Sequence, residues 1–429
     1  MYKAAVHLFD IFLISVVNIF LLGFPMWISI VASLIIYLGL YSFRVYDKDT
    51  MKSYTESLIR TLLGTIIGFV GVLIVYFFLN EFFNRHFFSV NLLSTISLLP
   101  ILHKVEYNTY EKYLPLRNYI VIGRKDEIGH IMDEISEKSM NKMRFVQYIN
   151  PSPVTLEKAV SEGKSAKENT AKIHGIVVAD PELEKIVKPQ IERYKSEGLE
   201  IQYLPNVVDK YLKRIPVEVV EKFADHYKIV FEEPKNSPTI RVLDIIFSIV
   251  LIVISSPFLI ISMLAILIDD LVHKQKVEVF FKQERYGQNG RKFEIYKLKT
   301  MRTVIDENGH FEDVPTKIGI ILRKFRLNEL PQLLNVLKND ISLVGPRPDI
   351  GPIKEFSEKN IPFYSYRTKV PQGITGHAQV FFRYPEEVSK EIYSERVSYD
   401  LYYVKNYSTS LYITTLLRTI ETVVMGRGK

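Results

Sequence analysis

Residues 240–268 read IRVLDIIFSIVLIVISSPFLIISMLAILI, an apolar run longer than the roughly 20 residues that a helix needs to cross a bilayer. Ser256 and Pro257 interrupt it near its middle, where a proline removes a backbone donor and bends a helix. Two forms are open: a spanning helix with a proline kink, or a helix that enters, bends and returns to the same face. Charges at both flanks, Arg241 and Lys274, favour the re-entrant form.

The segment that follows this run is basic. Residues 274–347 hold 15 Lys or Arg against 9 Asp or Glu. A positive segment directly after an apolar run indicates anionic partners at a membrane surface, either lipid headgroups or phosphorylated substrates. The chain has no cysteine, which excludes disulfides and thiolate chemistry.

Four further apolar runs open the chain, at residues 8–24, 26–43, 57–79 and 87–103. Each is near the length of a membrane span, so residues 1–104 are predicted to form four transmembrane helices. The first run is followed at once by another and has no small-residue cleavage site, which indicates an anchor and not a removed signal peptide. The second joint, between residues 44 and 60, carries the positive charge, and the positive-inside rule therefore places it, the N terminus and the exit beyond Lys104 in the cytoplasm.

Residues 118–215 have the pattern of a soluble α/β domain. Strand-like runs are expected at Tyr119–Ile122, Phe145–Ile149, Gly175–Val178 and Ile201–Leu204. Helical patterns between some of them, at Glu127–Ile135 and Glu182–Tyr194, predict a Rossmann-like domain with a parallel sheet. Gly123 and Gly129 follow the first strand, but the G-x-G-x-x-G spacing of a dinucleotide loop is absent, which favours a structural or regulatory role.

Residues 280–301, FFKQERYGQNGRKFEIYKLKTM, predict a β-hairpin that turns at Asn289-Gly290. One interpretation is an ordinary surface hairpin without a ligand. The other is a binding site for a polyphosphate, because several cations lie on this short ribbon: Lys282, Arg285, Lys297 and Lys299.

Residues 316–348 contain two further features that suit phosphate. Pro331 is expected in the first turn of a helix, which places Asn328 and Glu329 at the helix N terminus, where amide groups and the dipole favour anions. In Gly345-Pro346-Arg347-Pro348, two prolines make a rigid mount for one guanidinium. A capped helix and an ordinary turn would explain the same residues without a ligand.

From about Arg241 to the C terminus the chain resembles the bacterial sugar transferase family, the monotopic polyprenyl-phosphate phosphoglycosyl transferases. The resemblance covers about 190 residues, and the motifs occur in the family's order. They are the central Ser256-Pro257, Lys282–Arg285 with Gly287 and Gly290, Lys297–Met301, Leu322-Arg323, Glu329–Leu333, Val344–Pro348, Gly373–Gly376 with Ala378–Val380, and Asp400–Tyr403. Four leading helices and a small α/β domain resemble the long subgroup, which begins capsule, O-antigen or exopolysaccharide synthesis.

The resemblance implies transfer of a sugar 1-phosphate from a UDP-sugar to undecaprenyl phosphate, with release of UMP. In such enzymes an Asp-Glu pair stands where this chain has Asn328-Glu329, and the aspartate attacks the β-phosphate. By position Glu329 would assist Mg²⁺ or proton transfer, Arg323 and Arg347 would converge on one phosphate site, and the hairpin cations would line its floor. The resemblance thus implies a re-entrant monotopic α/β transferase domain over residues 240–429.

Asn328 departs from the family at the decisive position, because an amide is a poor nucleophile and a neutral metal ligand. Three explanations stay open: an engineered knock-out, a natural variant that uses Glu329 or direct transfer, and an inactive scaffold. The rival function is therefore a membrane scaffold that binds polyprenyl phosphate or nucleotide sugar. His377 has no acidic or histidine neighbour in sequence, and we expect a structural role for it.

Nucleotide sugars are cytoplasmic, so this chemistry requires the catalytic domain on the cytoplasmic face of the bacterial inner membrane and the re-entrant form of 240–268. The expected partners are UDP-sugar, undecaprenyl phosphate and membrane lipids. A homo-oligomer stays open, and no nucleic-acid partner is expected.

Overall fold

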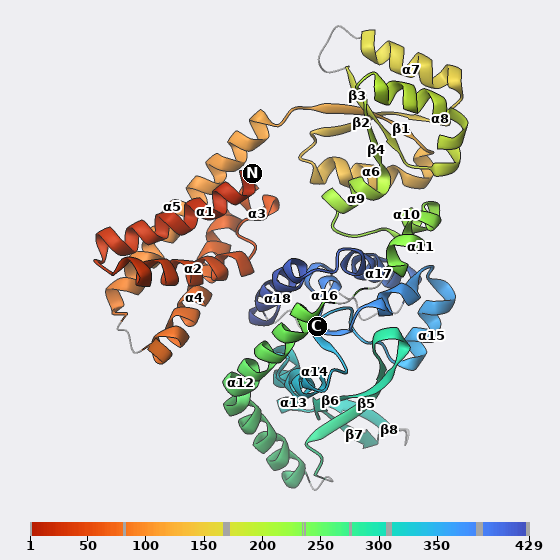
Figure 1. The fold of residues 1–429 in the computed structure, drawn as a ribbon. Coiled ribbons are helices and arrows are strands. Elements are labelled where there is room, and N and C mark those ends of the chain that lie inside the picture. The colour runs from red at the N-terminus through yellow and green to blue at the C-terminus, as the bar shows by residue number, and fades with distance from the viewer. Residues whose placement is uncertain are drawn as a thin grey trace. The chain divides into compact units, whose positions relative to one another are not determined.

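The computed structural model describes residues 2–79, 83–165, 172–233, 235, 237–273, 277–305, 311–382 and 389–425 (Figure 1). The chain divides into two compact units. The first comprises Met1–Leu114 and Leu417–Met425, and the second contains Pro115–Leu416.

The first unit is helical. Its elements are α1 (Tyr2–Val16), a π-helical turn η1 (Val17–Leu21), α2 (Met26–Ser42), α3 (Lys48–Lys52), α4 (Tyr54–Leu79) and α5 (Arg85–Tyr113). Most of each apolar run expected from the sequence lies within these helices, and only residues 22–24 and Phe43 of the predicted runs fall outside them. Helix α5 continues ten residues beyond its predicted end at 103, because no proline or glycine interrupts residues 104–113.

Glycines set the closest contact inside this unit. A Cβ atom on Gly39 of α2 would lie 2.3 Å from the carbonyl oxygen of Gly64 and 2.5 Å from the amide nitrogen of Gly68, both in α4. Close approach of this kind is the usual reason for small residues between membrane helices.

The interior of the first unit also holds polar pairs. His103 Nε2 lies 2.8 Å from a carboxylate oxygen of Asp10, and both side chains are fully buried. The amide of Asn91 donates to Asn18 Oδ1 at 2.7 Å. Ionisable side chains inside apolar helices are costly unless they are paired, and this pairing meets that requirement.

The end of helix α18 (Thr409–Val424) completes the first unit through partly buried ion pairs. The carboxylate of Glu421 contacts Arg44 at 2.7 Å and Arg60 at 2.9 Å. Arg418 forms a two-pronged contact with Asp47, at 2.6 and 3.0 Å.

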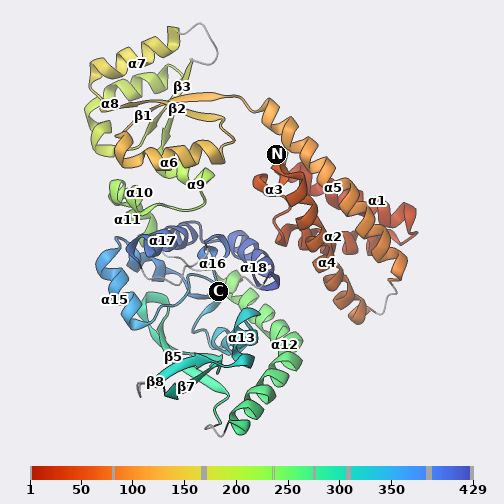
Figure 2. The ribbon, with the colours of Figure 1, turned by 180° about the vertical axis from the view of Figure 1, so that it is seen from behind.

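The second unit begins with the predicted α/β domain, and its sheet is parallel throughout. The strands are β1 (Arg117–Ile122), β2 (Met143–Ile149), β3 (Ile173–Val178) and β4 (Glu200–Tyr203), in the order β2-β1-β3-β4. Helices α6 (Lys125–Lys138) and α9 (Leu204–Tyr211) pack on one face, and α7 (Pro153–Ser165) and α8 (Pro181–Ser196) on the other (Figures 1 and 2). The four strands expected from the sequence are confirmed, except that Leu204 already begins α9.

Doubly wound domains bind ligands where the carboxyl ends of their diverging strands meet, here after β1 and β3. The amine of Lys222 fills this place, 2.5 Å from Glu127 and 3.1 Å from Asp180. Gly123 also has a packing reason, since a Cβ there would lie 2.9 Å from Ile128 and 3.2 Å from Ala179. Both observations favour the structural role predicted for this domain.

Helices α10 (Val217–Lys222) and α11 (Ala224–Glu232) lead to α12 (Pro238–Val272), which contains the whole apolar run of residues 240–268. Helix α12 changes direction along its length in both views (Figures 1 and 2). Pro257 cannot donate to the carbonyl of Val253, and the Ser256 hydroxyl donates to that carbonyl instead, at 2.8 Å. The Ser-Pro pair therefore bends the helix without leaving that carbonyl unpaired.

Antiparallel hairpins and short elements build the rest of the second unit. The strands are β5 (Phe280–Tyr286), β6 (Lys292–Leu298), β7 (Met301–Ile305), β8 (Phe311–Pro315), β9 (Ser342–Val344) and β10 (Gly373–Thr375). The helical elements are η2 (Gln288–Gly290), α13 (Lys317–Lys324), η3 (Leu327–Gln332), α14 (Leu333–Leu337), α15 (Gly351–Asn360), η4 (Tyr364–Lys369), α16 (His377–Phe381), α17 (Lys390–Lys405) and α18. The hairpin predicted at 280–301 is confirmed, with Asn289 and Gly290 at positive φ in its turn.

Both ends of α12 contact this part of the molecule. Near its start, the Arg241 guanidinium donates to the carbonyls of Val336 and Leu337, at 2.6 and 2.9 Å. Near its end, Asp269 pairs with Arg302 at 2.7 Å, and Asp270 with Lys299 at 3.3 Å.

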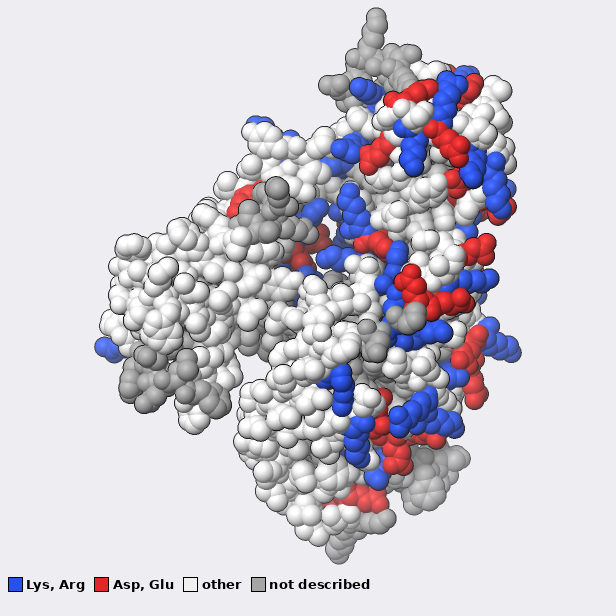
Figure 3. All heavy atoms as spheres, viewed as in Figure 1, with Lys and Arg blue, Asp and Glu red and all other residues white. Residues whose placement is uncertain are grey.

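Apolar side chains cover most of the exposed surface of α12. Among the described residues, three helices are long and apolar enough to cross a membrane: the Tyr54–Val75 part of α4, α5 and α12. Two shorter apolar helices cover Val6–Leu21 and Met26–Ser42. In Figure 3 the surface over α12 is mostly white, whereas Lys, Arg, Asp and Glu gather over the α/β domain and the elements around the hairpin. These apolar helices indicate a membrane protein. Its second unit also contains an α/β domain with a parallel sheet.

Candidate active site

The predicted phosphate segment forms a sharp turn. Helix α13 ends at Lys324, and Arg326 adopts a left-handed conformation with φ of 55° before η3 begins. This conformation is unusual for a residue other than glycine. The turn places Arg326 beside Glu329, three residues later in η3, so that their side chains form an ion pair of 3.2 Å.

Glu329 is buried among cations. Its Oε1 accepts from Arg347 Nη2 at 3.0 Å and lies 3.8 Å from Lys297 Nζ, while its Oε2 faces Arg326. Burial by itself would raise the pKa of this carboxyl, but Arg347, Lys297 and Arg326 outweigh burial and lower the pKa to about 2. Glu329 is therefore a carboxylate at any physiological pH.

Burial and mutual repulsion lower the pKa values of two cations near Glu329, Lys297 and Arg285. Burial, and then the charge of Arg347, lowers the pKa of Lys297 to about 8. The same two causes lower the pKa of Arg285 to about 10. One carboxylate thus faces an excess of positive charge, which an anionic ligand would relieve.

The hairpin explains which predicted cations reach Glu329. Cross-strand neighbours share a face, and β5 pairs with β6 so that Phe281 lies opposite Lys297 and Arg285 opposite Phe293. Arg285 and Lys297 therefore lie on one face. Lys282 lies on the other face, exposed, 3.7 Å from Glu294 and over the ring of Tyr296. The expectation that Lys282 lines the same floor is wrong, because three positions along a strand reverse the face.

Two other predicted residues lie apart from this cluster. Lys299 is paired with Asp270 at the end of α12. Arg323 lies in the last turn of α13, partly exposed, and none of its side-chain contacts with the described residues is a hydrogen bond or ion pair. The convergence of Arg323 and Arg347 on one anion stays a prediction, and Arg326 holds the position beside Glu329 that the sequence interpretation gave to Arg323.

Asn328 is partly exposed, and its amide makes no hydrogen bond to another described residue. Pro331 lies inside the 3₁₀ element η3 and not in the first turn of the helix, which begins only at Leu333. Helix α14 has five residues, too few for a useful dipole. Side-chain cations, and not a helix terminus, therefore supply the positive field at this site.

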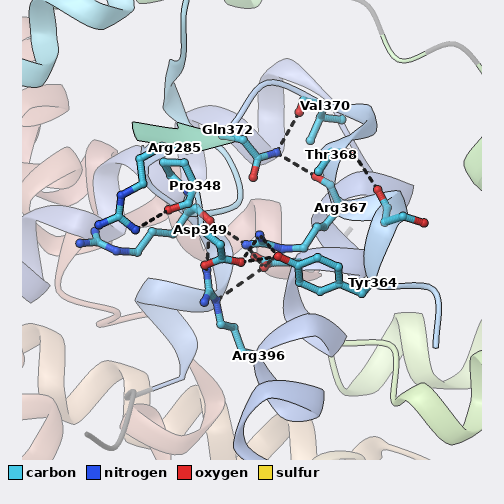
Figure 4. A network of polar contacts seen from close by, with 12 residues as sticks. Arg285, Pro348, Asp349, Tyr364, Arg367, Thr368, Val370, Gln372 and Arg396 are labelled. Atoms are coloured by element: carbon cyan, nitrogen blue, oxygen red, sulfur yellow. Dashed lines mark hydrogen bonds and ion pairs between the residues drawn. The ribbon is translucent and has the colours of Figure 1, made fainter. Parts of the chain in front are cut away.

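A second network, which sequence reasoning missed, contacts the main-chain carbonyl of Arg347 through Arg367 and Arg396. Figure 4 shows it from close by. It joins Asp349, Tyr364, Arg367, Arg396 and Asp400, all buried. The Asp400 run was recognised as part of the family pattern, but no spacing signal connects it with residues 349 and 367. His377 has the expected structural contact, since its Nε2 lies 2.8 Å from the carbonyl of Lys213.

The model of the family described as "Bacterial sugar transferase" matches residues 235–426, which include α12, the hairpin and the Glu329 site. The chain belongs to this family. The Glu329 site therefore lies within the matched segment.

The names of similar proteins are consistent with this family. A "UDP-N-acetylgalactosamine-undecaprenyl-phosphate N-acetylgalactosaminephosphotransferase" of Aeromonas hydrophila is 34% identical over 193 residues, 44% of this chain and 44% of the relative. A "UDP-glucose:undecaprenyl-phosphate glucose-1-phosphate transferase" of Caulobacter vibrioides is 33% identical over 189 residues, 43% of this chain and 69% of the relative. An "Exopolysaccharide production protein PSS" of Rhizobium leguminosarum is 34% identical over 199 residues, 44% of this chain and 96% of the relative. The match thus spans less than half of the Aeromonas protein and nearly all of the Rhizobium one.

Proposed function

We propose that this chain transfers a sugar 1-phosphate from a UDP-sugar to undecaprenyl phosphate and releases UMP, a first membrane step in the synthesis of a capsule, O-antigen or exopolysaccharide. The observation that carries the proposal is the Glu329 cluster, one buried carboxylate with Arg347, Arg326 and Lys297 at 3.0, 3.2 and 3.8 Å. The names of the Aeromonas and Caulobacter relatives support the same reaction class.

The cations suit both substrates, which carry phosphate oxygens. Arg347 and Arg326 both carry a guanidinium group, and a guanidinium can hold two phosphate oxygens at once. As charge develops on the transferring phosphoryl group, fixed cations in a partly buried site stabilise it more than water does.

Asn328 excludes the usual covalent step on that residue. Glu329 is also a weak candidate, because both of its oxygens face cations and its pKa is held at about 2. We therefore favour direct transfer. A phosphate oxygen of the acceptor forms the new bond to the β-phosphorus, the bond from that phosphorus to the bridging oxygen breaks, and UMP leaves with the electron pair.

Mg²⁺ is part of this proposal. The donors that the chain offers are the Glu329 carboxylate, which is deprotonated as a metal ligand must be, and the amide oxygen of Asn328. Two protein oxygens suit Mg²⁺ when substrate phosphates complete its coordination. When bound, the ion would neutralise charge on the diphosphate beside the Arg347 and Arg326 guanidinium groups.

The membrane topology is also proposed: four N-terminal spans, and α12 as a re-entrant helix that keeps the site on the cytoplasmic face of the inner membrane. Arg241 at one end and Asp269 and Asp270 at the other contact the same body of strands and short helices. A helix of 35 residues would be about 50 Å long if straight, far more than a bilayer core. A crossing helix would carry its two ends to opposite faces, which these contacts oppose.

A UMP-release assay tests the function. The purified protein, in nanodiscs with undecaprenyl phosphate and Mg²⁺, is given a panel of UDP-sugars beside its Asn328→Asp counterpart. Release by the unchanged protein supports direct transfer. Release only by Asn328→Asp identifies a silenced transferase. Binding of UDP-sugar with no release by either protein would establish the rival scaffold.

Mass spectrometry without the lipid acceptor separates the chemical routes. We expect Asn328→Asp to bind Mg²⁺ more tightly and to accumulate a sugar-phosphate adduct on residue 328, because a carboxylate adds both a negative ligand and a nucleophile. An adduct on Glu329 of the unchanged protein would contradict direct transfer.

Single cysteines test the topology, since the chain has none of its own. Thr239→Cys lies in the first turn of α12 and His273→Cys directly follows its last residue, and we expect an impermeant maleimide to reach both only from the cytoplasmic face. Labelling from opposite faces would overturn the re-entrant arrangement.

A further inference from the structure

The main-chain carbonyls of Pro346, Arg347 and Pro348 each accept a hydrogen bond. The Arg347 carbonyl accepts from Arg367 Nη2 at 2.8 Å and from Arg396 Nη2 at 3.0 Å. The neighbouring Pro346 carbonyl accepts from the amide of Gly373 at 2.9 Å, and that of Pro348 from Arg285 at 3.2 Å. Two prolines fix the backbone dihedral on either side of Arg347. Its main chain therefore has little freedom.

Arg367 is the centre of this support (Figure 4). Its side chain is fully buried and pairs with Asp349 at 2.6 Å and with Asp400 at 2.8 Å. Tyr364 also donates to Asp349, at 2.6 Å. Two carboxylates thus fix a planar fork of donors, and the fork in turn holds the Arg347 carbonyl.

The charges balance within this second network. Arg367 and Arg396 face Asp349 and Asp400, and Arg396 lies 2.8 Å from Asp349. A balanced, fully buried network has no charge to offer a ligand. The network contacts the Glu329 cluster through the main-chain carbonyl of Arg347, whose guanidinium lies 3.0 Å from Glu329.

We propose that Arg367, fixed by Asp349 and Asp400, is a positioning residue for the transfer reaction, which sets the guanidinium of Arg347 through the Arg347 main-chain carbonyl. The proposal rests on the transferase function. The two arginines then have different roles: Arg347 contacts the phosphate, whereas Arg367 acts only through Arg347.

Arg367→Lys is the main variant. Lysine keeps the positive charge, but a single ammonium cannot hold two carboxylates and a carbonyl in the geometry of a guanidinium fork. Tyr364→Phe is a milder second variant, which removes one hydrogen bond to Asp349. Glu395→Gln is the matched control, because Glu395 lies on the same helix as Arg396 and Asp400 but pairs with Arg214, at 2.8 Å.

The measurement is a double-mutant cycle between Arg367→Lys and Arg347→Ala, with kcat and KM from UMP release and the active fraction from the stoichiometry of UDP binding. We expect Arg367→Lys alone to lower kcat per active site by about 10- to 100-fold, the scale of a slightly misplaced group. In the Arg347→Ala background the same change should have almost no further effect, since residues that act as a unit are not additive. Glu395→Gln should leave kcat and KM unchanged.

Additive effects in the cycle would overturn the proposal, as would a variant that loses only active fraction while kcat per site is kept. If Arg367→Lys yields no folded protein, Tyr364→Phe enters the cycle in its place, with a smaller loss of kcat expected and the same test of additivity. Absence of both UDP binding and UMP release in the unchanged protein would refute the proposed function itself, and with it this inference. If the unchanged protein binds UDP but the effects of the two substitutions are additive, this inference is refuted and the proposed function stands.

Discussion

Two clusters of arginines and carboxylates meet at Arg347, and they differ in charge balance. The Glu329 cluster has three cations within 4 Å of one carboxylate, and Arg347 itself is 30% exposed there. The Arg367 network has two arginines and two aspartates, all nearly inaccessible. Excess charge that is partly open to solvent is a property of a ligand site, whereas balanced, buried charge holds a backbone in place.

The largest effect is expected where balance is broken inside the buried network. Asp400→Asn leaves Arg367 and Arg396 facing a single carboxylate, and loss of one partner from a buried ion pair costs about 3–5 kcal/mol of unfolding free energy. Denaturant unfolding in detergent would measure this loss. A change within experimental error would mean that the network contributes little to stability.

Glu329→Gln removes the counter-charge of the other cluster. We expect UMP release to fall by about 10²- to 10³-fold, the scale of losing one preorganised charged group from a site. Affinity for UDP in the presence of EDTA should hold or increase, because the cations no longer have a competing carboxylate. Turnover close to that of the unchanged protein would remove Glu329 from the mechanism.

Arg347→Ala removes the side chain that the two clusters share. A charge-assisted hydrogen bond contributes about 1.5–3 kcal/mol, so UDP-sugar should bind at least several-fold more weakly. Arg291→Ala on the same hairpin is the control, since that side chain is 74% exposed. Calorimetry with the protein in nanodiscs would compare the two, and unchanged binding by Arg347→Ala would contradict its assignment.

The pKa of about 8 at Lys297 predicts a pH effect. Lys297 is charged below that pKa and neutral above it, so a rise in pH removes one of the cations that hold phosphate. We expect UDP affinity to fall by about 3- to 10-fold between pH 7 and 9. Lys297→Arg keeps its charge and should show a flatter profile. An equal decline in both proteins would assign the effect to another group.

Lys282→Ala should have the smallest effect. Lys282 lies on the opposite face of the hairpin, more than half exposed, and exposed ion pairs contribute little. UDP binding and UMP release should both stay within about twofold of the unchanged protein. A larger loss would show that the two faces of the ribbon act together.

The sequence by itself predicted much of the fold. Apolar runs, strand patterns and the Asn289-Gly290 turn are local signals, and the helices, the parallel sheet and the hairpin appear where these signals lie. Ser256-Pro257 likewise predicted a bend in α12, because the lost donor of a proline acts on the same turn of helix.

Only the tertiary structure decided the membership of the site. Strand alternation separated Lys282 from Lys297, a left-handed turn brought Arg326 and not Arg323 to Glu329, and Asp270 took Lys299. The Arg367 network joins positions 349, 367, 396 and 400, for which no short-range pattern exists. Local backbone preference depends on neighbours in the chain, and the sequence therefore determined it, whereas the neutralisation of a buried charge depends on side chains that come together only when the chain is folded.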